Sequence, residues 1–124
     1  MKLSPSETSE QALYALGEQA RALLMRRDYV ALANQFGYAL AYGREHAAAM
    51  QEDHQRAAAS PNVIEPDGTP VVVKYLKPNS TGLYAVVECA VPVTKSSAVL
   101  LELIVSGNAE DRHITVEDIS GASA

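Results

Sequence analysis

Three groups of residues have the types and spacing that chemistry requires, and the first is a histidine–methionine series. His46, Met50 and His54 recur every fourth residue, which places them on one face of a helix. Two imidazoles and a thioether can bind a soft metal ion such as copper. No carboxylate or cysteine continues this four-residue spacing to complete the ligand set, so packing within a helix is the favoured interpretation. We expect no metal and no other cofactor.

The second group is a pair of carboxylates. Glu88 and Glu102 occupy matching positions of two expected strands, and two close carboxylates can carry out general acid–base catalysis when one pKa is raised. The pair falls on the sheet face turned away from the expected helix-lined pocket. Cys89 falls on the opposite, apolar face, where a thiol is buried and unreactive. We therefore assign no catalytic residue, and a non-enzymatic protein is favoured.

The third group is aromatic. Tyr38 and Tyr42 are four residues apart and adjacent on a helix, and together with His54 and Tyr75 they could line a small-molecule pocket between helices and sheet. Tyrosine has an apolar ring and a polar tip, which also suits ordinary helix–sheet contacts. Packing and a pocket are both open interpretations of these four side chains.

Length and composition limit the elements that can position these groups. The chain has 124 residues, 48% of them hydrophobic, which predicts a single domain over residues 1–124. One cysteine excludes an intrachain disulfide and a multi-cysteine zinc site. A net charge of −5 argues against nucleic acid as a partner. Neither a signal peptide nor a membrane-spanning segment is expected, so we predict a cytoplasmic protein with no membrane contact.

A helical half is predicted over residues 4–59. Ser4 and Glu7 form a capping box in front of the first helix, and Asp28 caps a second helical segment. Glycines weaken the middle of that segment. The pattern allows either one long helix from 29 to 58 or two helices that break near Gly43.

A β half is predicted over residues 70–119, followed by a loose tail at 120–124. Apolar and polar residues alternate over 71–77, 83–91, 99–106 and 112–119, and the connections are short enough for antiparallel hairpins. The sequence therefore predicts an α+β fold, with two or three N-terminal helices packed on one face of a four-stranded antiparallel meander.

Alternation assigns each strand residue to one of two sheet faces. The inner face, under the helices, is apolar and consists of Val71, Val73, Tyr75, Leu83, Ala85, Val87, Cys89, Val91, Val99, Leu101, Leu103, Val105, Ile114 and Val116. The outer face mixes apolar and charged residues: Val72, Lys74, Leu76, Tyr84, Val86, Glu88, Leu100, Glu102, Ile104, His113, Thr115 and Glu117. A monomer rarely leaves such an apolar patch open.

In the expected register, Glu88 and Glu102 are direct cross-strand neighbours, and Lys74 lies diagonally close enough to relieve their repulsion. One interpretation is a solvated face with a surface ion pair. The other is a recognition surface, with Lys74, Tyr84, Val86, Glu88, Leu100, Glu102 and Ile104 as the binding residues.

The order of elements, together with the segment from Arg26 to Leu32 (RRDYVAL), resembles the nuclear-transport-factor-two-like superfamily and its cystatin-like α+β roll. That resemblance implies dimerisation through the outer sheet face. It also implies lyase, isomerase or hydrolase chemistry by Asp–His or Asp–Arg pairs inside the cone, but no such residue carries over, because the inward positions here are Leu, Val, Ala and Cys. Chain size, acidity and the regions 93–97 and 118–119 are similar to small bacterial proteins of unknown function, including toxin-neutralising immunity proteins.

Two hypotheses result. The leading one is a non-enzymatic, immunity-type interaction protein that uses the outer sheet face to form a homodimer or to bind another protein, with its negative charge favouring a basic partner. The alternative is a small-molecule-binding or catalytic roll whose pocket lies between helices and sheet.

Overall fold

The alternating second half of the chain forms an antiparallel sheet in the computed structural model, which describes residues 1–65, 68–108 and 110–122. Its long strands are β3 (Val71–Tyr75), β4 (Leu83–Thr94), β5 (Ser97–Asn108) and β6 (Asp111–Ser120). Two short strands, β1 (Lys2–Leu3) and β2 (Asn62–Val63), pair with β6 and β5. The α+β class is confirmed, with six strands in the sheet rather than four.

The first half forms three helices, α1 (Glu10–Met25), α2 (Tyr29–Phe36) and α3 (His46–Ala59), with short 3₁₀ turns η1 (Pro5–Thr8) and η2 (Ala39–Ala41). The capping box of Ser4 and Glu7 caps η1 and not α1. The backbone is extended at Ser9, and the Ser9 side chain accepts a hydrogen bond from Ala12 N at 3.2 Å to begin α1. Asp28 caps α2 as predicted.

The second helical segment breaks earlier than Gly43 alone would require. Gly37 ends α2 with φ +72°, and Tyr42 and Gly43 follow η2 with φ +51° and +83°. These left-handed angles cannot continue a helix, and glycine adopts them at no steric cost. The chain therefore forms two separate helices, and a continuous helix over 29–58 is wrong.

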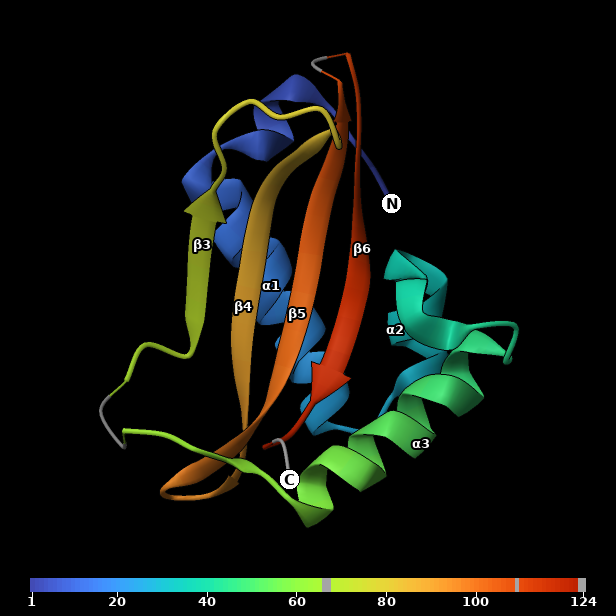
Figure 1. Ribbon diagram of the computed structural model, residues 1–124, viewed down its shortest axis with the longest axis vertical. Helices are drawn as coiled ribbons and strands as arrows, with labels where there is room; N and C mark the ends of the chain where they lie inside the picture. The colour runs from blue at the N-terminus through green and yellow to red at the C-terminus, as the bar shows by residue number, and fades with distance from the viewer. Residues whose placement is uncertain (66–67, 109, 123–124) are drawn as a thin grey trace.

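All three helices lie on one side of the sheet or beyond its β6 edge. In Figure 1, α1 runs behind β4 and β5, while α2 and α3 lie beside β6. α1 approaches the sheet closely at Gly17, where an added Cβ would lie 2.7 Å from Val87 Cγ1 and 2.8 Å from Val71 Cγ1. The core lies between this helical layer and the inner sheet face, on which Val87, Leu101 and Leu103 are fully buried.

The first and the last described residues bind to the rest of the fold. Met1 O accepts a hydrogen bond from Ile114 N at 2.9 Å, which adds β1 to the edge of β6. Ser120 belongs to β6, and Ala122 N donates to Ser60 O at 2.7 Å, so the loose tail predicted at 120–124 is wrong for residues 120–122. The last two residues, 123–124, lie outside the described part.

Candidate functional site

The outer face of the sheet is the face opposite the helices, and no helix packs on it in the described part of the chain (Figure 1). Val86, Leu100 and Ile104 lie there half-buried, while Val72 and Leu76 are exposed. None of these five side chains packs against the main hydrophobic core. The structure thus places apolar side chains on an uncovered sheet face.

Carboxylates form a row across this face. Glu88 pairs directly with Glu102, as the predicted register requires. On the other side Glu102 pairs with Asp118, because a β-bulge at Glu117 shifts the register of β6 by one residue. Lys74 Nζ lies 2.5 Å from Glu88 Oε1 and is the cation that the described residues place beside this row. We call Glu88, Glu102, Glu117 and Asp118 the acidic row.

The acidic row perturbs the titration of its central member. Partial burial, followed by repulsion from Glu88, Asp118 and Glu117, raises the pKa of Glu102 above its ordinary value, and Lys74 offsets only part of this. Conversely, the Glu88 carboxylate raises the pKa of Lys74. The raised pKa of Glu102 meets one requirement of a general acid, but the side chain lies on an open sheet face instead of in an enclosed pocket.

An apolar hollow of about 240 Å³ lies beside the acidic row, displaced along β4 and β5 toward β2. It is lined by Asn62, Ile64, Ala90, Ala98, Val99 and Leu100. Leu100 and Glu102 are two residues apart on β5, so the hollow and the acidic row are about 7 Å apart. The outer face therefore combines an apolar depression with negative charge at short range.

Tyr84 does not belong to the outer face, which corrects the predicted binding surface. Leu83 pairs with Ser106 and Ala85 with Val105, so Tyr84 is the extra residue of a β-bulge. A bulge reverses the alternation at its position. The Tyr84 ring packs against the core instead, in edge contact with Tyr75 at 5.5 Å between ring centroids.

The four side chains predicted to line one pocket are spread over the fold. Tyr38 is buried, and its hydroxyl donates to Asp53 Oδ2 at 2.5 Å. His54 Nδ1 lies 2.8 Å from Tyr29 Oη. Tyr42 is 80% exposed. Tyr75 lies on β3 at the other edge of the sheet, where its hydroxyl donates to Thr8 O at 2.8 Å. They do not form the predicted common pocket.

A buried carboxylate that sequence reasoning missed joins α3 to the η2 segment. Asp53 is only 8% exposed and accepts hydrogen bonds from Tyr38 Oη, from Arg44 Nη1 and Nη2 at 3.0 and 3.1 Å, and from Arg56 Nη1 at 3.3 Å. Burial on its own raises the pKa of Asp53, but hydrogen bonds from Arg44 and Tyr38 lower it overall. A carboxylate with its oxygens occupied in this way is held ionised and is suited to stabilising the fold.

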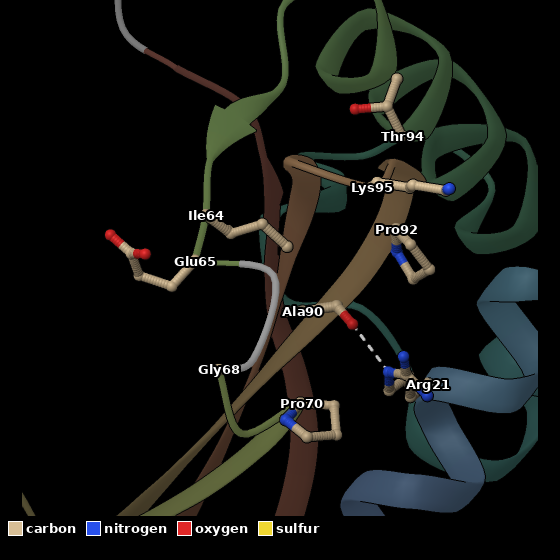
Figure 2. Close-up of a pocket in the computed structure, with 9 residues that line it drawn as sticks. All are labelled: Arg21, Ile64, Glu65, Gly68, Pro70, Ala90, Pro92, Thr94 and Lys95. Atoms are coloured by element: carbon tan, nitrogen blue, oxygen red, sulfur yellow. Dashed lines mark hydrogen bonds between the residues drawn. The ribbon is translucent and has the colours of Figure 1, made fainter.

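A further depression lies at the open edge of β4 (Figure 2). Its volume is about 470 Å³, and Arg21, Pro70, Pro92 and Lys95 are among its lining residues. Arg21 Nε donates to Ala90 O at 2.7 Å. This bond satisfies the carbonyl of a residue that pairs with Pro70, since Pro70 accepts a hydrogen bond from Ala90 N but has no N–H to donate in return. Arg21 therefore completes the edge of the sheet.

No metal centre is found among the described residues, and comparison with known proteins gives no match. No group of three His, Cys, Asp or Glu side chains in residues 1–65, 68–108 and 110–122 is arranged to hold a metal ion. Over the same residues, no helix combines the length and apolarity needed to cross a membrane. No family model, curated protein or solved structure matches the chain. The cystatin-like resemblance therefore stays a prediction.

Proposed function

We propose that this protein is a non-enzymatic binding protein whose outer sheet face docks a positively charged protein partner. The observation that carries the proposal is the acidic row, in which Glu102 lies directly between Glu88 and Asp118 on an uncovered face. Like charges placed opposite one another across strands destabilise a sheet. A partner that places cations against this row would relieve the repulsion. The same cations would therefore bind the acidic row and stabilise the folded sheet.

The neighbouring hollow supports the same proposal. An interface needs a desolvated apolar centre as well as charge, and energetically dominant contacts are made by side chains that fill pockets. The hollow beside Leu100 offers such a pocket, about 7 Å from Glu102. A partner with an apolar side chain and a Lys or Arg at i and i+2 of a strand, or at i and i+4 of a helix, matches this spacing.

A basic partner fits this face better than a second copy of the chain. A two-fold axis through the middle of the outer face would bring two acidic rows together, and such like-charge contacts cost several kcal/mol. A protein with a cationic nucleic-acid-binding surface would instead be attracted, and its association would be accelerated by long-range steering. The net charge of −5 adds to that attraction.

The proposal is tested by photo-crosslinking followed by reconstitution. A benzophenone amino acid replaces Ile104, on the outer face, and in a matched variant replaces the exposed Tyr42, which is remote from it. We expect Ile104 alone to yield an adduct, with a protein that carries net positive charge. The adduct partner is then purified and its dissociation constant is measured at 50 and 300 mM salt, with the wild-type chain and with Glu102→Lys.

We expect binding to weaken at least tenfold at the higher salt concentration and at least tenfold again with Glu102→Lys. An adduct between two copies of the chain, accompanied by a dimer in light scattering that Leu100→Asp dissociates, would replace the basic partner with self-association. An acidic partner, salt-independent binding or equal adducts from both positions would refute the proposal.

A further inference from the structure

A third depression, remote from the hollow beside β2, lies at the opposite end of the sheet. It has a volume of about 360 Å³, and its lining includes Leu76, Pro78, Leu83, Tyr84 and Arg112. The lining thus combines apolar side chains with a single cationic one. Pockets for small molecules commonly have this size and composition.

The walls of this pocket are held in place without a ligand. Asn79 Nδ2 donates to Lys77 O and to Leu83 O, each at 2.9 Å, and Asn79 Oδ1 accepts from Thr81 N at 3.1 Å. Gly107 N donates to Gly82 O at 2.9 Å, which joins the loop before β4 to the end of β5. A preformed pocket loses little conformational entropy when it binds.

Arg112 has unused hydrogen-bonding capacity. Its guanidinium carbon lies 3.6 Å from the centroid of the Tyr84 ring, which fixes the group by a cation–π contact. Its Nε is buried and has no hydrogen-bond partner. The ion pairs found among residues 1–65, 68–108 and 110–122 do not include Arg112, and the nearby Asp111 carboxylate is bound to Lys2 and His113.

A half-buried guanidinium without a carboxylate is unfavourable, because burial removes water from the charge and the face of the Tyr84 ring offers it no hydrogen-bond acceptor oxygen. An anion that enters the pocket would meet the outer nitrogens of Arg112 in the planar geometry that carboxylates bind well. Leu76, Leu83 and Pro78 would at the same time cover an apolar chain or ring. An acidic ligand without an apolar part would leave these apolar side chains exposed to water.

We infer that this pocket binds a small apolar molecule that bears one carboxylate. Arg112 binds the carboxylate, and Leu76 and Leu83 contact the apolar part. The inference does not depend on the acidic row or on the proposed protein partner. Tyr84 serves here as the platform that orients Arg112, a role that its position on a β-bulge makes possible.

The test compares octanoate with octanol, each below its micelle-forming or solubility limit, by titration of the ¹⁵N-labelled protein. We expect octanoate to bind saturably and to shift the amide resonances of Gly82, Leu83 and Gly107. Octanol should bind at least tenfold more weakly, because it lacks the charge. This comparison uses the wild-type chain, so it tests the inferred ligand class even if a variant does not fold.

Two variants locate the binding site. Arg112→Met keeps the length of the side chain and should weaken octanoate binding at least tenfold, while Arg26→Met, at the exposed end of α1, should leave it unchanged. Absence of saturable binding, equal affinity for the acid and the alcohol, or shifts confined to residues around Leu100 would overturn the inference.

Discussion

Replacing Asp53 by Asn tests whether the buried carboxylate holds the helical layer together. The substitution keeps the size of the side chain but removes its charge and turns one acceptor into a donor. That donor must face either Tyr38 Oη or the Arg44 guanidinium, both of which now donate to Asp53. The two arginines would also lose their shared counter-charge.

The cost follows from how far each contact is shielded from water. A hydrogen bond to a charged group contributes about 1.5–3 kcal/mol. The Tyr38 contact is buried and keeps this value, whereas the arginine contacts are discounted because the side chains of Arg44 and Arg56 are 32% and 69% exposed. We expect Asp53→Asn to lower the free energy of unfolding by about 3 kcal/mol at pH 7. For a chain of this length, that corresponds to a decrease in Tm of roughly 10 °C.

The effect must also depend on pH. Because the folded pKa of Asp53 is below its ordinary value of 3.8, the carboxylate contributes stability above that value and loses it as the pH falls through the folded pKa. The difference between wild type and Asp53→Asn should therefore be full at pH 7 and shrink as the pH falls below the ordinary value of 3.8. Urea unfolding followed by circular dichroism at pH 7, 5 and 2.5 measures it.

Glu52→Gln is the matched control, because Glu52 is the neighbouring acid on α3 and its side chain is 58% exposed. It should change the free energy of unfolding by less than about 0.5 kcal/mol. A loss below 1 kcal/mol for Asp53→Asn at pH 7, or an equal loss at every pH, would show that the buried carboxylate does not stabilise the helical layer.

Three further predictions concern the sheet and its contact with α1. Because the folded pKa of Glu102 is raised, its ionisation opposes folding above the ordinary pKa, and Glu102→Gln should stabilise the protein at pH 7 with no gain below pH 4. The control Glu18→Gln, at an exposed position, should leave the stability unchanged at both pH values. Urea unfolding at pH 7 and below pH 4 measures both variants. Gly17→Ala should destabilise by about 1–2 kcal/mol, since overpacking outweighs the gain in helix propensity, and adding Val87→Ala should recover part of the loss in a thermal-melting double-mutant cycle. Burial raises the pKa of the Cys89 thiol to about 12, so a thiol reagent such as DTNB should react with it only after unfolding, and rapid labelling of the native protein would contradict this.

The pairing of the long strands can mostly be predicted from local sequence. The turn around Lys95 and the alternation of β4 and β5 were enough to pair Glu88 with Glu102, because side-chain direction repeats every two residues and one hairpin sets the register. The same rule failed at Tyr84 and Glu117. Each is the extra residue of a bulge, and one inserted residue reverses the faces on one side of it without a clear mark in the sequence.

The buried polar contacts could not be predicted from the sequence, for a different reason. Asp53 meets Arg44 and Tyr38 across nine and fifteen residues of chain that contain a helix end, a 3₁₀ turn and left-handed backbone. Helical spacing cannot relate residues on opposite sides of such breaks. Tyr29 begins α2 and His54 lies in α3, and only the packing of α2 on α3 brings them together.

The amino-acid pattern alone thus established the α+β class, the apolar inner face and the charged character of the outer one, because these properties depend on neighbours within a few residues. Tertiary structure decided which charges share a surface and which are buried. The bulge in β6 brought Asp118 beside Glu102, and that in β4 placed Tyr84 under Arg112. Such contacts depend on how strands and helices pack against one another. A shift of one residue in strand register changes every cross-strand partner.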